Sequence, residues 1–335
     1  MVMTTDELLG RGISSQSLSR SVASGELVRL RPGFYVEGSA KELPRESRHL
    51  LAVLAADAAL DSPVFSHSSA ALVHGLPGWG LPLRRVTTSA PGDKGRSRTS
   101  RLVTHHTGRL DDEDVTRIDG LHVTTAPRTL VDVALSTGRD AAVSVADAAG
   151  HRGLVTDPDV ELALQQASGR MGVKRARAAL NLVDSRSESV AETLSRLTFL
   201  DHGLPTPETQ ANIFDTHGTR IARVDFLWRE FGVIGECDGF GKYFDGADGP
   251  ELRRRLAREK DRDAELLALG YRVLHWRWAD LEQPRLLAER IRRVLYPAAA
   301  LAEDTRSEPG NHGTVLPRPA APVSPARPFA TSHPD

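Results

Sequence analysis

The sequence predicts a protein of the α/β class, α+β overall, that folds as more than one domain. Its 335 residues correspond to two or three domains at about 150 residues each. Segments in which apolar residues alternate, as in strands, are separated by segments with apolar residues at helical spacing. Hydrophobic residues make up 40% of the chain but aromatic residues only 5%, so Ala, Leu and Val must supply most of the packing.

The composition excludes several classes of protein. The formal net charge of −1 excludes a uniformly basic, histone-like protein, although local basic patches are compatible with it. The single cysteine, Cys237, excludes a disulfide framework and a cysteine-based zinc finger, and it fits a reducing cytoplasm. The sequence has no run of about 18 apolar residues, so it predicts no membrane span. Its N-terminus is acidic and lacks the apolar segment of a secretory signal. We therefore expect a cytoplasmic protein.

Changes in pattern divide the chain into five parts. We expect a small N-terminal domain over residues 1–40, a mixed α/β middle domain over 45–135 and a helical connector over 136–184. A second α/β domain follows over 185–297. Residues 298–335 are dense in proline with almost no large apolar residue, so they cannot bury enough surface to offset the entropy of ordering. We expect this tail to be disordered.

The first part predicts a winged helix. Thr4 or Thr5 can cap a helix in DELLGRG, and Ser14 or Ser15 can cap a second helix that Gly25 ends. The alternating segments LVRLR and GFYV then predict two strands about a Pro-Gly turn. A second helix of this kind enters the major groove of DNA, and basic residues on the wing contact phosphates.

The residues expected to contact DNA lie outward on the second helix and on the wing: Ser15, Gln16, Ser19, Arg20, Arg29 and Arg31. Acidic and basic side chains balance over residues 1–40, so a protein-binding winged helix is the alternative interpretation.

The segment ELLGRGISSQSLSRSVASGELVRLRPGFYV resembles the N-terminal domain of AbiEi-type antitoxins, the transcriptional autorepressors of type IV toxin–antitoxin systems. The resemblance continues through PVFSHSSAALVHGLPGW and TTAPRTLVDVA. It implies that the chain binds DNA at an operator, and it makes a cognate toxin a candidate partner.

Histidines of the middle part allow a metal or a structural interpretation. His67 and His74 lie seven residues apart, which places them on one face of a helix, but metal-binding pairs usually lie four apart. Capping and packing roles are therefore favoured. His105 and His106 are adjacent on a predicted strand and point to opposite faces, so they cannot chelate one ion together.

The second α/β domain contains a predicted hairpin with two acidic residues. RVDFLW and GVIGECD read as strands joined by a turn at residues 229–232. In an antiparallel pair, Asp225 and Glu236 meet across the hairpin among apolar neighbours. Buried carboxylates are costly without a cation, and Mg²⁺ prefers oxygen ligands of this kind.

The helix that follows the hairpin adds charged residues. Apolar residues at helical spacing place Lys260 and Asp263 on the stripe that should pack inward. Lys and Arg exceed Asp and Glu over residues 250–295, which suits a phosphate backbone, and Arg262 is a candidate to line the DNA path. Trp276 and Trp278 are candidates for the same path or for the core.

Five segments of this domain resemble the PD-(D/E)XK nuclease superfamily and, more narrowly, small Vsr-like endonuclease-fold domains. They are ETLSR, GLPTPETQ, RVDFLW, GECDGFGKY and EKDRDAELLALGYRVLHWRWADL. The resemblance implies a restriction-endonuclease-like αβββαβ core. It also implies an acidic helix residue at Glu192, metal ligands at Asp225 and Glu236, and a further oxygen from the main-chain carbonyl of Cys237.

The chain departs from the superfamily pattern at one position. A lysine normally follows the second acidic residue by two positions, and here Asp238 stands there. Lys242 or Lys260 could supply the missing ammonium group, and Asp238 could instead be a third metal ligand. The usual lysine stabilises charge on the phosphate.

Two functions follow from these patterns. The first is a Mg²⁺-dependent DNA endonuclease, with Mn²⁺ as the alternative ion, targeted by its winged helix. The second is an AbiEi-like regulator or antitoxin whose nuclease-fold domain binds without cutting. A protein-interaction scaffold is a third interpretation. The chain has no P-loop and no G-x-G-x-x-G after a strand, so we expect no nucleotide cofactor.

Overall fold

The part of the chain that the structure describes is α+β and contains three sheets. The structure is a computed structural model that describes residues 2–92, 96–238 and 249–297. The chain divides into two compact units, residues 1–185 and a second unit that begins at Arg186. The finer division of the first unit into three parts stays a prediction, and the expected disordered tail lies outside the described residues. Among the described residues, no helix is both long enough and apolar enough to cross a membrane.

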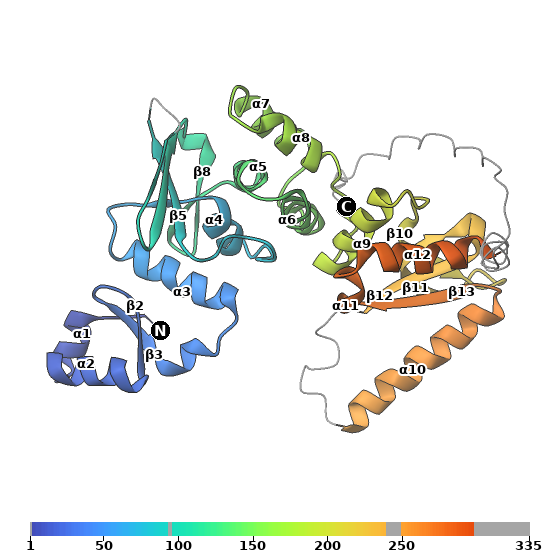
Figure 1. Cartoon of the computed structure of the whole chain (residues 1–335), viewed down its shortest axis with the longest axis horizontal. Helices are drawn as coiled ribbons and strands as arrows, with labels where there is room; N and C mark the ends of the chain where they lie inside the picture. The colour runs from blue at the N-terminus through green and yellow to red at the C-terminus, as the bar shows by residue number, and fades with distance from the viewer. Residues whose placement is uncertain (1, 93–95, 239–248, 298–335) are drawn as a thin grey trace, which may run out of the picture. The chain divides into compact units, whose positions relative to one another are not determined.

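The N-terminal part of the first unit has the helices and strands that the sequence predicts, with one short additional strand (Figure 1). Its elements are β1 Met3–Thr4, α1 Thr5–Gly10, α2 Ser15–Ser24, β2 Leu27–Arg31 and β3 Phe34–Glu37. The Thr4 side chain caps α1 in a capping box with Glu7, and the Ser14 side chain caps α2. Gly25 ends α2 with a φ of 84°, which a residue with a Cβ adopts only under strain.

A small core holds this part together. Leu8 and Leu18 from the two helices pack with Met3 and Tyr35 from the strands. The three strands form an antiparallel sheet in the order β1-β3-β2. The winged-helix pattern therefore forms because each helix buries one apolar stripe against a two-stranded wing.

The rest of the first unit is a six-stranded mixed sheet with helices. The elements up to the last strand are η1 Gly38–Lys41, α3 Arg45–Asp57, β4 Val64–Phe65, α4 His67–Val73, β5 Val86–Pro91, β6 Arg96–Thr99, β7 Val103–Gly108, η2 Asp112–Asp114, β8 Val115–Ile118 and β9 Leu121–Thr124. The strand order is β6-β7-β5-β4-β9-β8, with the pairs β5–β7 and β4–β9 parallel. Val53, Phe65 and Val123 are fully buried in its core.

Four helices complete the first unit: α5 Ala126–Ser136, α6 Arg139–His151, α7 Asp157–Gln166 and α8 Val173–Leu180. Helix α5 is buried along most of its length, including the charged residue Asp132. A carboxylate in that position needs charged or hydrogen-bonding partners from other elements.

The second unit has the predicted succession αβββαβ, followed by two more helices. Its elements are α9 Val190–Asp201, β10 Glu208–Phe214, β11 Arg220–Trp228, η3 Arg229–Phe231, β12 Val233–Asp238, α10 Gly249–Ala268, β13 Arg272–Arg277, α11 Trp278–Leu281 and α12 Pro284–Leu295. The sheet order is β10-β11-β12-β13, antiparallel except for the parallel pair β12–β13. Gly232, at the predicted turn, has a φ of 58°.

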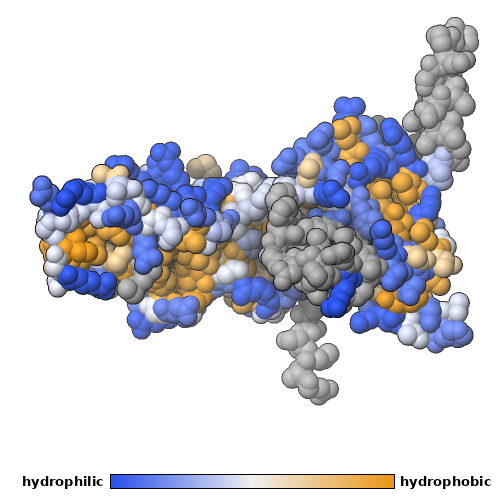
Figure 2. Space-filling model, turned by 90° about the horizontal axis from the view of Figure 1, so that it is seen from below, coloured by the Kyte–Doolittle hydropathy of each residue, from blue (hydrophilic) through white to orange (hydrophobic). Residues whose placement is uncertain are grey.

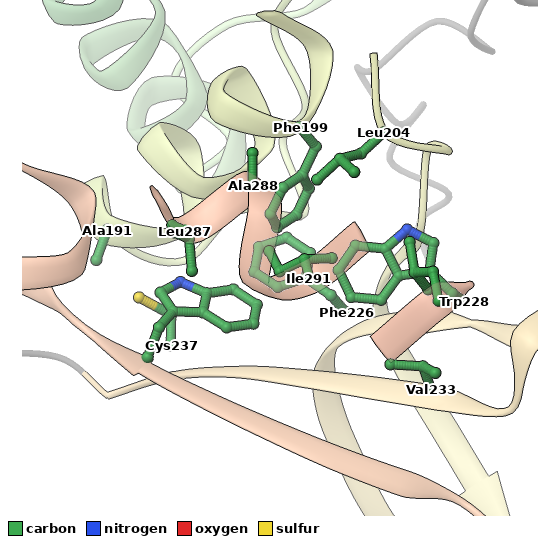
Figure 3. Packing of buried hydrophobic residues seen from close by; sticks show 12 residues of the cluster. Ala191, Phe199, Leu204, Phe226, Trp228, Val233, Cys237, Leu287, Ala288 and Ile291 are labelled. Carbon is green, nitrogen blue, oxygen red and sulfur yellow. The ribbon is translucent and has the colours of Figure 1, made fainter. Parts of the chain in front are cut away.

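Each face of this sheet has its own core. Figure 3 shows Phe199 of α9 beside Phe226 of β11, with Leu287 and Ile291 of α12 in the same cluster. Trp276 belongs to this core, where its indole N–H donates to the Ser195 hydroxyl at 2.8 Å. The tryptophan is therefore a packing residue and not a DNA contact.

The other core lies on the α10 side and corrects the predicted inward stripe of that helix. Leu266 is fully buried, whereas Leu267 is 58% exposed and Lys260 is exposed. The stripe that contacts the sheet is thus one residue away from the predicted one, and Asp263 is half-buried at its edge. Figure 1 shows α10 extending past the sheet, so periodicity along its whole length is a poor guide to the part that packs.

Candidate functional site

The second helix of the winged helix presents a polar surface. Ser15, Gln16, Ser19 and Arg20 are exposed, while Leu18 on the opposite side is buried. The Ser19 hydroxyl donates to the carbonyl of Ser15 at 3.0 Å, and Arg20 donates to the Ser17 hydroxyl at 3.2 Å. Small hydroxyls, an amide and a guanidinium on one helix face are the groups that contact base edges and phosphates.

The two arginines of the wing differ in their surroundings. The register shifts between Arg29 and Arg31, which interrupts the alternation that would place both on one face. Arg29 is exposed, whereas Arg31 is half-buried with its guanidinium 5.8 Å from the centre of the Phe34 ring. Arg29 is thus available to a phosphate, and Arg31 contributes to packing of the wing.

Asp225 lies at an irregularity of the four-stranded sheet of the second unit. Phe226 pairs with Gly235, so continued pairing would place Asp225 opposite Glu236. The Asp225 side chain instead accepts from the main-chain N–H of Cys237, at 2.8 Å from Oδ2. On the other side, Gln210 has a φ of 55°. Val224 and Leu227 pack in one core and Phe226 in the other, so simple alternation fails at Asp225.

A glutamine joins two carboxylates at this point. Gln210 Nε2 lies 2.8 Å from Glu192 Oε2 and 3.4 Å from Asp225 Oδ1. Glu192 also accepts from the Ser189 hydroxyl at 2.8 Å and from the Glu188 N–H at 3.0 Å. Burial raises the pKa of Glu192, and the negative charge of Asp225 adds to the increase. Ser189 is the N-cap of α9, and the Glu192 side chain both supports this helix start and belongs to an acidic pair.

Glu236, Asp238 and Arg262 belong to a second group of charges. Arg262 lies 3.4 Å from Glu236 Oε1 and 3.9 Å from Asp263 Oδ1. His275 lies 3.1 Å from Asp263 and 4.0 Å from Asp238. Arg262 is half-buried in this network, so its described contacts are with carboxylates of its own domain.

These placements bear on the predicted metal ligands and lysines. The Cys237 side chain is buried and burial raises the pKa of its thiol to about 12, so only its main-chain oxygen could serve a hard cation. Lys260 is exposed, and Lys242 lies outside the described residues. Across residues 2–92, 96–238 and 249–297, no three His, Cys, Asp or Glu side chains gather as a metal site.

Two proteins of Mycobacterium tuberculosis are similar to this chain over most of its length. They are named "Uncharacterized protein Rv2248" in strain ATCC 25618 / H37Rv and "Uncharacterized protein MT2308" in strain CDC 1551 / Oshkosh. Each is 30% identical over 288 residues, which cover 84% of this chain and 97% of the mycobacterial protein. The chain belongs to their family.

A family model described as "Transcriptional regulator, AbiEi antitoxin" matches residues 2–38 of the chain described here. The matched residues are the winged helix with its exposed α2 surface. The resemblance to AbiEi antitoxins is therefore confirmed for the N-terminal part. The resemblance of residues 185–297 to Vsr-like endonucleases stays a prediction.

Sequence reasoning missed two sets of polar residues. Gln210 lies in the quoted segment GLPTPETQ, but its bridging role depends on a positive φ that no pattern indicated. In the first unit, sequence reasoning missed Asp132, which is buried close to His67, a residue that the sequence singled out only for capping or packing. The signal was a lone aspartate in the apolar segment TLVDVAL, which requires a partner wherever that helix is buried.

Proposed function

We propose that this protein is a cytoplasmic DNA-binding transcriptional regulator and that its winged helix binds the operator. The observation that carries the proposal is the exposed polar surface of α2, with Gln16 and Arg20 on it and Arg29 on the neighbouring wing. The match of residues 2–38 to a family of transcriptional regulators supports it. A toxin encoded with the regulator is the partner that the family description suggests.

Binding of the full chain to DNA tests the proposal. We expect fluorescence anisotropy to show tighter binding to a duplex from upstream of its own coding sequence than to a shuffled duplex. Gln16→Ala should reduce that preference by about 1–3 kcal/mol, because an amide side chain reads base edges. Arg29→Ala should weaken binding to both duplexes and reduce the salt dependence by about one charge.

The matched control is Arg117→Ala, because Arg117 is an exposed arginine of the same unit on β8, outside the winged helix. It should bind both duplexes as the unchanged protein does. Equal affinity for the two duplexes in the unchanged protein would contradict operator recognition. Absence of binding to either would leave the protein-interaction scaffold as the better interpretation.

We propose metal-dependent DNA cleavage by the second unit as a second candidate function. The observation in its favour is the acidic pair of Glu192 and Asp225, held by Gln210 beside the main chain of Cys237. The oxygen donors of Asp225 and Cys237, with Glu236 next in register, suit a hard cation such as Mg²⁺ or Mn²⁺. Such an ion would polarise a phosphodiester and activate water.

Incubation of supercoiled plasmid with the full chain distinguishes the candidates. Nicking that needs Mg²⁺ or Mn²⁺, stops with EDTA and is lost in Asp225→Asn and Glu236→Gln would support cleavage. Asp215→Asn is the matched control, because Asp215 also accepts main-chain N–H groups but lies in the turn after β10. Retardation of the plasmid without nicking would support the regulator alone.

A further inference from the structure

A cavity of about 980 Å³ in the first unit belongs to neither proposed function. It lies beside the strands β5 and β7, and residues after α7 close another side. Its lining includes His67, Ser89, His106, Arg128 and Arg170. Volumes of this size accommodate small organic ligands, and a few convergent polar groups usually orient them.

Arg170 is held by the carboxylate of Asp132, which is not itself among the residues that line the cavity. Asp132 is fully buried and accepts from Arg170 at 2.7 Å through Oδ1 and from Arg128 at 2.9 Å through Oδ2. Within the described parts of the chain, Asp132 is the one side-chain hydrogen-bond partner of Arg170, whose side chain is 38% exposed. The guanidinium is thus held in place while most of its N–H donors remain available.

Arg128 has a different role. Its guanidinium donates to Asp132, to Asp114 at 2.7 Å and to the carbonyl of Arg109 at 3.0 Å. These bonds connect α5 to the segment around η2, so Arg128 supports the cavity wall. The charge of Asp132 is shared between two arginines. Arg128 uses three of its five N–H donors in these bonds, whereas Arg170 uses one and keeps four for a ligand.

A serine relay orients His67. The Ser89 hydroxyl donates to the Ser66 hydroxyl at 2.8 Å, and the Ser66 hydroxyl lies 2.9 Å from His67 Nδ1. When the Ser66 hydroxyl donates to Nδ1, the ring proton of His67 is on Nε2. The ring stacks on that of His106, with the centroids 4.0 Å apart. Two imidazoles therefore line the same cavity as three arginines, Arg109, Arg128 and Arg170, and the carboxylates Asp111 and Asp114 lie in the same lining.

The backbone of His67 is also unusual. Its φ is 50°, in the left-handed region that few residues other than Gly adopt, with Asn, Asp and His the commonest of these. Strained backbone of this kind persists where the surroundings hold it and is concentrated at ligand-binding and catalytic sites. Burial lowers the pKa of His67 to about 4, so at neutral pH the ring is an uncharged donor.

We propose that this cavity binds the phosphate group of a small organic molecule, with Arg170 and His67 as the phosphate contacts. Phosphate oxygens accept from several directions, which matches donors that come from different elements of the fold. The cavity is much larger than one phosphate ion, and Met171 at its lining is 95% exposed, which suits an apolar or aromatic remainder of the ligand. The chain has no glycine-rich phosphate loop, so the side chains carry the binding.

Isothermal titration calorimetry of the full chain at neutral pH and low ionic strength tests the proposal. The probes are AMP, inorganic phosphate, adenosine and acetate. We expect AMP to bind more tightly than phosphate, and adenosine and acetate to give no signal. Equal affinity for phosphate and AMP would identify the free ion as the ligand and still support the site. Absence of binding by both, or binding of adenosine or acetate equal to that of AMP, would overturn it.

Three variants locate the binding. Arg170→Gln should weaken AMP binding about tenfold or more, because a charged hydrogen bond is lost. Ser168→Asp is the second variant, since Ser168 is exposed and lines the cavity, so a carboxylate there repels the anion without disturbing the core. Arg139→Gln is the control, because Arg139 pairs with Asp140 and is not among the lining residues. Wild-type affinity in Ser168→Asp would overturn the proposal even where Arg170→Gln fails to fold.

Discussion

Two buried carboxylates, Asp132 in the first unit and Glu192 in the second, have pKa values shifted in opposite directions by their neighbours. Burial alone raises the pKa of Asp132, but its interactions with His67, Arg128 and Arg170 outweigh burial and lower it. Burial also raises the pKa of Glu192, and there the neighbouring charge is Asp225, which raises it further. The comparison shows that burial makes a carboxylate costly, whereas the partners from other elements decide whether it keeps its charge.

The largest expected effect comes from removing the charge of Asp132. Asp132→Asn leaves Arg128 and Arg170 without their shared buried counter-charge, which should destabilise the first unit by about 3–5 kcal/mol. Hydrogen exchange of peptides from α5, followed by mass spectrometry, would measure the loss within that unit. Protection equal to that of the unchanged protein would show that the arginines find other partners.

The next effect is a pH dependence set by His67. Its pKa is about 4 in the folded chain against 6.5 for an unperturbed histidine, so the unfolded state binds a proton first as the pH falls. The stability of the first unit should therefore be greatest above pH 6.5 and decrease by roughly 3 kcal/mol between pH 6.5 and 4. His67→Gln should flatten the profile of α5 hydrogen exchange over this range. An unchanged slope in the variant would assign the titration to another group.

A smaller effect of opposite sign is expected at Glu192. Because its pKa is raised, its contribution to stability is present below the unperturbed value of 4.5 and is lost as the pH rises through the folded pKa. Glu192→Gln should remove this pH dependence. It should also destabilise the second unit at neutral pH by about 1 kcal/mol, because hydrogen bonds that Glu192 accepts are weakened. Hydrogen exchange of peptides from α9, followed by mass spectrometry, would report it within the second unit. Destabilisation as large as that of Asp132→Asn would contradict the comparison.

The smallest effect is expected at the surface. The Arg139–Asp140 pair is more than a third exposed on both sides, so solvent screens it. Arg139→Gln should change the stability of the first unit by no more than about 0.5 kcal/mol, measured by the same hydrogen exchange. A loss comparable to that of Asp132→Asn would mean that exposure does not separate the two kinds of ion pair.

On the face seen in Figure 2, hydrophobic residues appear in patches between hydrophilic ones. The sequence identified the helices and strands of the winged helix through caps and turns. The balanced charge over residues 1–40 left the kind of partner open.

Some sites could be predicted because their causes are local. Thr4, Ser14 and Gly25 act within one turn of the helices they begin or end, and Gly232 acts within its own turn. The predicted inward stripe of α10 was wrong by one residue, because the contact of this helix with the sheet depends on where the sheet ends. The alternation expected around Asp225 failed because of a distorted partner strand at Gln210.

The sequence by itself determined the order of elements, their caps and the presence of acidic residues in apolar segments. Tertiary structure alone decided that Asp132 meets Arg170, 38 residues away, and that Gln210 lies between Glu192 and Asp225. Caps and periodicity depend on interactions within a few residues, which the chain order specifies directly. The ionisation of a buried group depends on charges that only the packing of distant elements brings together.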